Sequence, residues 1–212
     1  MGTERSPRPE WAITAFRDDD VEEVSAMLGR AFSENPVARA TLAHCSPEGR
    51  LARVIRLHRG LVRSVHLGGE IEVVRHEGRV VGASLTYPPE GNRAGLAAFA
   101  WTALGALGVG PRGTYRYWIY DKHVSPLHPS APHHYLFILG VDPPHQGRGV
   151  GAALLRALCD RADRSRSPAY LETDKESSVR LYERHGFVVR EDLTIPELGG
   201  LRTWTMWRPP RD

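Results

Sequence analysis

The segment from Leu139 to Ala152 constrains the fold of this chain more than any other stretch. It completes a run of large apolar residues, His134 to Val141, which predicts a buried central strand. A proline-stiffened loop and a glycine-rich turn follow, and Gly149 to Arg164 then has the spacing of an amphipathic helix. Glycines let backbone N–H groups converge on an anion because no Cβ stands in the way, and a helix N-terminus adds unpaired N–H groups and a positive dipole end. The segment therefore predicts an α/β fold whose turn holds a pyrophosphate.

The elements expected around this segment are a mixture of strands and helices. Alternating or apolar runs predict strands at residues 11–16, 71–75, 79–86, 134–141, 169–173, 187–194 and 201–207. Helices are expected to begin at Asp19 or Asp20 and after Ser46, and to cover residues 93–109, 149–164 and 175–185. The aromatic stretch 115–120 matches neither pattern. This order predicts an α/β sheet with a parallel crossover in its second half.

Composition bounds the class of protein. A length of 212 residues suits one domain, expected over residues 11–208, after a flexible N-terminus at residues 1–10 that does not resemble a signal peptide. Hydrophobic residues make up 41% of the chain and charged residues 25%, which is a globular composition. The net charge of +3 is too small and too evenly spread to indicate a nucleic-acid partner.

The sequence also indicates that the protein has no membrane span, no disulfide and no cysteine-rich metal site. The longest uncharged run, Ala94 to Pro111, is shorter than the ~20 strongly apolar residues of a membrane span, so we expect no membrane partner and interpret the run as a buried or groove-lining helix. Cys45 and Cys159 lie far apart, which excludes a disulfide framework and a Cys-rich zinc site and fits a reducing cytosol. A cytoplasmic protein without a metal is therefore expected.

A second class of protein shares part of this pattern. Residues 147–152 read G-R-G-V-G-A, which satisfies the G-x-G-x-x-A fingerprint of dinucleotide-binding domains. Glu172 stands about 20 residues further on, where that fold places its ribose carboxylate. Too little chain follows Glu172 for the rest of such a fold, and a hairpin and several helices precede the turn. A nucleotide-cofactor-dependent oxidoreductase stays as the alternative.

Two motifs carry a resemblance to a known family. Residues 146–151 read Q-G-R-G-V-G, which resembles the Q/R-x-x-G-x-G/A signature of the GNAT superfamily of acetyl-CoA-dependent N-acetyltransferases. Residues 182–187 read Y-E-R-H-G-F, which resembles the second signature of that family, Y-E-x-x-G-F. The similar stretches are residues 134–152, 171–173, 182–187 and 202–206. The resemblance implies a mixed, mostly antiparallel central sheet with a parallel crossover and flanking helices.

The resemblance also implies which residues bind acetyl-CoA. It assigns the pantetheine arm to Leu139 and Val141, and the phosphates to Gln146, Gly147, Arg148, Gly149, Val150, Gly151 and Ala152. Ser178 stands where relatives often have an asparagine that contacts the cofactor, and its shorter reach leaves that contact open. Backbone N–H groups near the end of the strand are expected to stabilise the oxyanion, with Gly140 marking a bulge that splays the strand from its neighbour.

The implied reaction is direct attack by an uncharged primary amine on the thioester, within a ternary complex. The expected acceptor is a small-molecule amine, with antibiotic-like amines as one class, and a homodimer is compatible with this interpretation. Tyr182 matches the usual general acid of the family, which protonates the departing thiolate. Glu172 is the first candidate for the general base, and His133 and His134 come next.

The acceptor pocket is the part of the site that the motifs leave open. In the family that the motifs resemble, the acceptor pocket draws on the early helices, the segment before the central strand and the last hairpin. In this chain the resemblance therefore implies these aromatic candidates: Phe32, Trp101, Tyr115, Tyr117, Trp118, Tyr120 and Trp204. A catalytically silent CoA-binding module is a further alternative, because the CoA pocket and turnover are separable properties.

Overall fold

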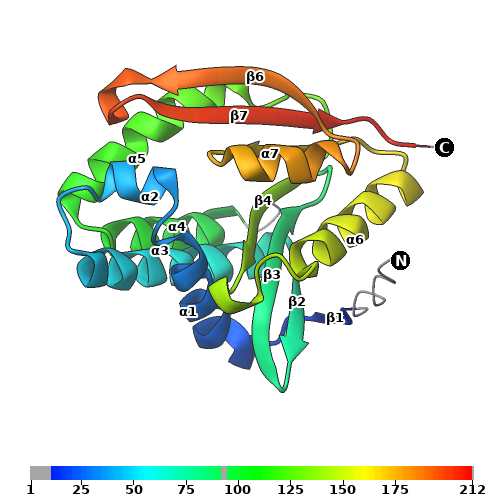
Figure 1. Cartoon of the computed structure of the whole chain (residues 1–212), viewed down its shortest axis with the longest axis horizontal. Coiled ribbons are helices and arrows are strands. Elements are labelled where there is room, and N and C mark those ends of the chain that lie inside the picture. The colour runs from blue at the N-terminus through cyan, green and yellow to red at the C-terminus, as the bar shows by residue number, and fades with distance from the viewer. Residues whose placement is uncertain (1–10, 92–94, 212) are drawn as a thin grey trace, which may run out of the picture.

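The computed structural model describes residues 11–91 and 95–211, which form one sheet of seven strands with helices on both faces (Figure 1). The strands are β1 (Ile13–Ala15), β2 (Glu70–His76), β3 (Arg79–Tyr87), β4 (His134–Val141), β5 (Ala169–Thr173), β6 (Val188–Ile195) and β7 (Leu201–Arg208). The α-helices are α1 (Val21–Phe32), α2 (Pro36–Thr41), α3 (Pro47–Gly68), α4 (Gly95–Leu107), α5 (Pro111–Val124), α6 (Val150–Arg164) and α7 (Glu176–Glu183). The strand order β1-β2-β3-β4-β5-β7-β6 confirms the predicted mixed sheet. The expected flexible N-terminus lies outside the described residues.

The sheet changes character between β4 and β5. These strands are parallel, whereas the other strand pairs among the described residues are antiparallel. The β4–β5 pairing runs from His134 opposite Ala169 to Leu136 opposite Leu171, and then stops. Beyond Leu136, β4 continues to Val141 beside β3. The predicted parallel crossover is confirmed, and the separation of β4 from β5, called the splay below, opens a slot in the sheet.

The bulge that accompanies the splay lies at Phe137 and not at Gly140, where we expected it. The register of β3 and β4 shifts between Leu85, which faces Ile138, and Thr86, which faces Leu136, so Phe137 is the extra residue. Gly140 pairs regularly in the ladder. A Cβ on Gly140 would lie 2.4 Å from Leu28 Cδ2, so this glycine is required for the close approach of α1 to the sheet.

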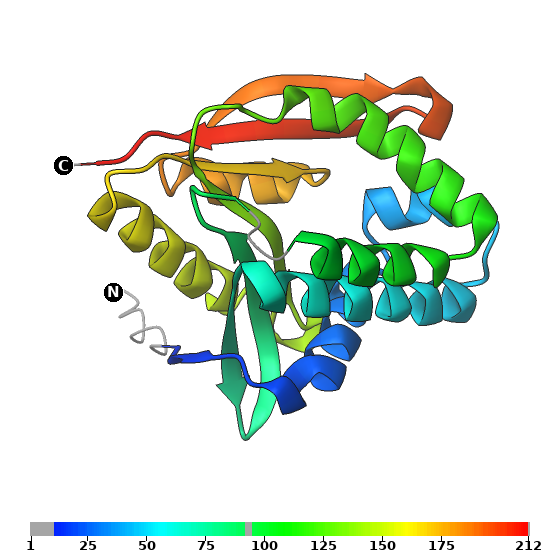
Figure 2. The same ribbon diagram turned by 180° about the vertical axis from the view of Figure 1, so that it is seen from behind.

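Helices cover the sheet on both sides of the splay (Figures 1 and 2). On one face α1 and α3 pack against β2, β3 and β4, where Met27, Val62 and Leu85 belong to one buried cluster. On the opposite face α6 packs against the same strands through Val150 and Leu154. The far end of α6 also shares a buried cluster with α7, β5 and β7. The N-terminus of α6 is thereby fixed beside the end of β4.

The predicted helix starts are confirmed. Ser46 caps α3, and its Oγ accepts a hydrogen bond from the Gly49 N–H at 3.1 Å. Asp20 precedes α1 at the end of a short 3-10 turn, and its carboxylate accepts a hydrogen bond from the Arg17 N–H at 2.8 Å. These local signals are readable because both partners lie within three residues of each other.

The interpretation of residues 94–111 as a buried or groove-lining helix is wrong for α4. Leu96 is 87% exposed, and Phe99 and Leu107 are each 71% exposed. Contact with α3 is made through small residues instead: a Cβ on Gly60 would lie 2.5 Å from the Trp101 carbonyl oxygen. The ribbons of α3 and α4 run side by side (Figure 2), and the large apolar side chains of α4 are exposed. Residues 92–94 of the predicted helix lie outside the described residues.

Two helices were not predicted. The aromatic stretch that matched no pattern lies in α5, which begins with Pro111 at its first position. Tyr115 and Trp118 lie three residues apart on its exposed side and stack on each other, with ring centroids 5.8 Å apart. The short α2 also begins with a proline, Pro36, but its six residues are too few to show a helical period.

Candidate active site

A cavity of about 610 Å³ lies at the splay, between the end of β4, the N-terminus of α6 and the helix α7. Most of the residues predicted to bind acetyl-CoA line it: Leu139, Val141, Gln146, Gly147, Gly149, Val150, Gly151, Ala152 and Ser178. Tyr182 and Glu172, the predicted acid and base, line it as well. Residues from four separate segments therefore meet in what is called the first cavity below.

The glycine turn has a backbone that other residues rarely adopt. Gly147 and Gly149 have φ angles of 75° and 92°, in the left-handed region that favours glycine. Gly149 is the N-cap of α6 and gives no side-chain cap, so the first N–H groups of this helix have no side-chain oxygen from it. Gln146 braces the turn to the strand, because its Nε2 donates a hydrogen bond to the Val141 carbonyl at 3.0 Å. This cradle has the donor chemistry that a pyrophosphate requires.

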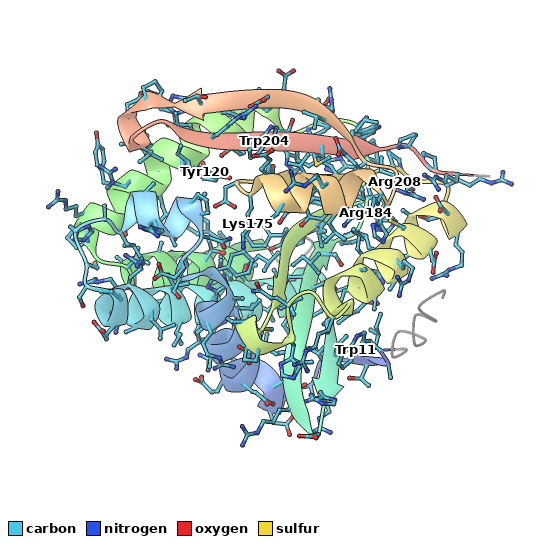
Figure 3. The ribbon with its side chains drawn as sticks, viewed as in Figure 1. Trp11, Tyr120, Lys175, Arg184, Trp204 and Arg208 are labelled. Carbon is cyan, nitrogen blue, oxygen red and sulfur yellow. The ribbon has the colours of Figure 1, made fainter. Side chains whose placement is uncertain are left out.

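Arg148 is not among the residues that line the first cavity, although it was predicted to bind the phosphates. It is exposed, and its carbonyl accepts a hydrogen bond from Trp11 Nε1 at 2.9 Å. Two cations that we did not single out, Lys175 and Arg184, line the cavity instead. They stand at the two ends of α7 (Figure 3). Arg184 belongs to the second sequence motif, which is the signal that could have identified it.

Tyr182 is buried beneath the first cavity. Its ring lies edge-on to Phe187, with centroids 5.9 Å apart, and only 7% of the residue is exposed. Burial, and secondarily the charge of Asp174, raises the pKa of the Tyr182 phenol above its usual value. The phenol therefore keeps its proton throughout the neutral range, as a general acid must.

A second cavity of about 460 Å³ adjoins the first on the side of α1, α3 and α5. The two cavities share residues that lie at the splay: Phe32, Asn35, Phe137, Ile138, Glu172, Thr173 and Asp174. A molecule in one cavity would therefore face a molecule in the other across the end of β5. This arrangement suits a reaction between two bound substrates.

Glu172 is positioned at this junction by two neighbours. The Tyr135 hydroxyl donates a hydrogen bond of 2.6 Å to its Oε2, and His128 Nδ1 lies 3.6 Å from its Oε1. Asp174, two residues further on, accepts a hydrogen bond from the Val37 N–H at 2.8 Å. Burial raises the pKa of the Asp174 carboxyl. Two carboxylates thus line both cavities, where we had predicted only Glu172.

His133 and His134, the other candidate bases, line neither cavity. His133 Nδ1 donates a hydrogen bond to the Ala131 carbonyl at 2.6 Å, and its ring packs 5.4 Å from that of Tyr170. His134 Nε2 lies 2.9 Å from Ser165 Oγ, on the side of α6. Burial lowers the pKa of both imidazoles. The histidine that contacts Glu172 is His128, which carried no sequence signal.

Only some of the predicted acceptor-pocket aromatics line the second cavity, namely Phe32, Tyr117 and Tyr120. Trp204 is buried in the core formed by α6, α7, β5 and β7. Tyr115 and Trp118 are on the exposed side of α5. Trp101 lies under the Arg63 guanidinium at 4.5 Å. Sequence distance could not separate these cases, because the face that each helix turns to the cavity depends on its packing.

His58 forms part of the wall of the second cavity. Its ring stacks on Phe32, with centroids 5.2 Å apart, and its Nδ1 donates a hydrogen bond to the Val54 carbonyl at 2.8 Å. Burial lowers the pKa of His58 to about 4. The imidazole is therefore neutral at physiological pH.

The titration of His58 predicts how stability depends on pH. Because its folded-state pKa lies below the unfolded value of 6.5, the unfolded chain binds more protons between these values, so stability falls as pH falls from 6.5 through about 4. The expected loss from this group is about 3 kcal/mol at most. His58→Phe keeps the ring stack and should flatten this part of the profile in urea unfolding. An equal pH slope in both proteins would contradict the assignment.

No group of three or more His, Cys, Asp or Glu residues in residues 11–91 and 95–211 is arranged to hold a metal ion. Among the helices that the structure describes, none is long and apolar enough to cross a membrane.

The sequence model of the acetyltransferase (GNAT) family matches residues 45–187, and the chain belongs to this family. Among curated relatives, a mycothiol acetyltransferase from Nocardiopsis dassonvillei is 34% identical over 122 residues, which are 56% of this chain and 28% of that protein. An N-alpha-acetyltransferase RimI from Mycobacterium tuberculosis is 42% identical over 67 residues, which are 30% of this chain and 41% of that protein. The matches span less than half of the length of each of these relatives.

These relatives correct a finer interpretation of the motifs. Residues 134–152, 171–173, 182–187 and 202–206 are also similar to puromycin N-acetyltransferase, and from them we expected that protein to be the family member most like this chain. The first curated relatives are instead mycothiol acetyltransferases, followed by RimI. The motifs describe the acetyl-CoA side of the site, which the whole family shares. They carry no information on the acceptor.

Solved structures show the same fold. A histone acetyltransferase HPA2-related protein from Corynebacterium glutamicum superposes with a TM-score of 0.68 at 22% identity, over 96% of this chain and 98% of that one. A polyamine N-acetyltransferase from Drosophila melanogaster superposes with a TM-score of 0.57 at 18% identity, over 94% of this chain and 99% of that one. The likeness extends across the sheet and its helices.

Proposed function

We propose that this protein is an acetyl-CoA-dependent N-acetyltransferase that acts on a primary amine of a small molecule. The observation that carries the proposal is the meeting of two cavities at the splay, with Glu172 in the wall of both. Family membership supports acetyl-CoA as the co-substrate. The continuous sheet from β1 to β6 supports a single acetyltransferase domain over residues 11–208.

The residues of the first cavity fit acetyl-CoA. The turn at Gly147 and Gly149 and the first N–H groups of α6 would bind the diphosphate, with Lys175 and Arg184 adding positive charge. The backbone at Gly151 is not crowded by other protein atoms, since even an added Cβ would make only an ordinary contact of 3.5 Å with Val141 Cγ2. The end of β4 that lacks a β5 partner would receive the pantetheine arm along Leu139 and Val141.

The residues at the junction then supply the chemistry. An amine in the second cavity loses its proton to Glu172, whose neighbour His128 is 36% exposed and gives the proton a route to solvent. The amine attacks the thioester carbonyl, and the acetyl group leaves sulfur for nitrogen. Tyr182 donates its proton to the departing thiolate, and the proton that the acetylated nitrogen then releases restores the phenol, so one proton passes from nitrogen to sulfur in the step.

The two alternatives make different use of the same cavity. An oxidoreductase would place a dinucleotide on the glycine turn, but the sheet order here is not that of a doubly wound parallel fold. A silent CoA-binding module would keep the first cavity without needing Glu172 beside the second. The position of Glu172 and Asp174 at the junction favours an enzyme.

Ligand binding tests the proposal directly. Acetyl-CoA at about a hundred times its dissociation constant should raise the free energy of unfolding by about 2.7 kcal/mol, with no such effect of NAD or NADP. Gly151→Asp should abolish this rise, because a carboxylate would repel the diphosphate while favouring the start of α6. Gly151→Ala is the matched control and should bind normally. Stabilisation by NAD and not by acetyl-CoA would overturn the proposal.

A further inference from the structure

Among the residues that the structure describes, the charged side chains that line the second cavity include acidic residues but no Lys or Arg. Three carboxylates line it: Glu172 and Asp174 at the junction, and Asp121, which does not border the first cavity. None of the described residues that line it is Lys or Arg, although the chain has 28 of these against 25 Asp and Glu. The first cavity differs, since Lys175 and Arg184 line it. Lys and Arg side chains thus line the first cavity and, among the described residues, do not line the second.

Arginines near the second cavity are held by other partners. Arg50 donates to the Ser33 carbonyl at 2.7 Å, Arg53 to the Val109 carbonyl at 2.9 Å, and Arg116 to the Ala40 carbonyl at 3.0 Å. These side chains belong to α3 and α5, the same helices that form the cavity wall. Each of these guanidinium groups donates to a backbone oxygen, and none of the three side chains lines the cavity.

The rest of the wall is apolar or neutral. Phe32, Leu57 and Phe137 form part of it, together with the rings of Tyr117 and Tyr120. Burial raises the pKa of both tyrosines, so neither carries charge in the neutral range. His58 is neutral as well, as argued above. His128 and Tyr135 also belong to the wall and both face Glu172: His128 Nδ1 lies 3.6 Å from Oε1, and the Tyr135 hydroxyl donates to Oε2 at 2.6 Å.

We infer that the acceptor is a compact hydrophobic amine that carries no carboxylate or phosphate near its amino group, an inference that rests on the acetyl-transfer function proposed above. An ammonium group is attracted to the three carboxylates, and an apolar body fills the space between the aromatic walls. An anionic group would lose its water without gaining a cation and would face like charge. The volume of about 460 Å³ suits a small molecule rather than a peptide segment.

Matched pairs of amines test this inference. Thiol release from acetyl-CoA is measured with 2-phenylethylamine against phenylalanine and with tyramine against tyrosine, each rate being referred to the concentration of uncharged amine. The amine of each pair should have a kcat/KM at least about a hundredfold above that of the amino acid, which corresponds to about 2.7 kcal/mol. Spermidine and an alanine-initiated peptide serve as a polycation and a protein-like N-terminus.

Reversing the charge of one wall residue tests whether the preference for amines over amino acids is electrostatic or is set by the shape of the cavity. Asp121 is exposed, so Asp121→Lys should fold and should lower the ratio within each pair at least tenfold by giving the carboxylate a partner. Asp160→Lys is the matched control, since Asp160 is an exposed acid on α6 that lines neither cavity. The control should leave the ratio unchanged.

The outcomes distinguish this inference from the function on which it rests. If acetyl-CoA does not bind in calorimetry, the proposed function and this inference both fail. If acetyl-CoA binds, the inference alone is overturned when amino acids match their amines, when the peptide or spermidine is the preferred acceptor, or when neither hydrophobic amine is bound or acetylated.

Discussion

Replacing Glu172 by glutamine is expected to lower kcat about a hundredfold, which lies within the range for loss of a general base. Glutamine keeps the volume of the side chain and can still accept the hydrogen bond of 2.6 Å from the Tyr135 hydroxyl, so the wall between the cavities is preserved. It cannot take a proton from the amine. The measurement is steady-state thiol release at saturating acetyl-CoA, with the KM for acetyl-CoA expected to stay within about twofold of the original.

Glu191→Gln is the control for this variant, because Glu191 is exposed on β6 and borders neither cavity. A fall in kcat of less than about threefold for Glu172→Gln would remove Glu172 from the mechanism. The base would then be sought at Asp174, which also borders both cavities and whose carboxyl pKa is raised by burial.

Replacing Tyr182 by phenylalanine is expected to lower kcat at least roughly tenfold, about 1.4 kcal/mol, with acetyl-CoA affinity unchanged. The ring stays packed against Phe187, so the variant should fold. Because burial raises the pKa of the Tyr182 phenol, the loss should be the same from neutral to mildly alkaline pH. Single-turnover rates at several pH values measure this directly.

Tyr115→Phe provides the matched control, since Tyr115 is 61% exposed on α5. An unchanged single-turnover rate for Tyr182→Phe would show that the thiolate takes its proton from water or from another group, and the tyrosine would be a packing residue only.

Most of the lining of the first cavity could be predicted because its signals are local. The end of β4, the glycine turn and the start of α6 are consecutive in the chain, and glycine at a left-handed φ has few alternatives. Tyr182 was predicted from a motif whose members lie within one helix and its end. Apart from α2 and α5, which were not predicted, the bounds of strands and helices agreed for the same reason, since each follows from a period read over a few residues.

The acceptor side could not be predicted, because it is assembled from distant segments. His128 reaches Glu172 across 44 positions of sequence, and no pattern links the two. Asp174 lies two residues beyond Glu172, yet its role at the junction depends on the point at which β5 leaves β4. Gly140 was predicted to mark a bulge because it is a glycine in a strand. The structure shows that a glycine is required there because Leu28 of α1 approaches closely, and this contact between distant segments leaves no pattern in the sequence.

The short seam between β4 and β5 divides the sheet into two unequal blocks, one ending at β4 and the other beginning at β5. Only three residue pairs join β4 to β5 in the described residues, which is a weak connection between the blocks. Their association therefore depends on the helices that contact both blocks and on a ligand bound between β4 and β5. Acetyl-CoA bound in the gap between β4 and β5 would contact both blocks of the sheet and stabilise their association. Hydrogen exchange of the backbone amides of residues 137–141 and 171–174 should then be slower in the complex with acetyl-CoA than in the free protein, and by a similar factor in both segments.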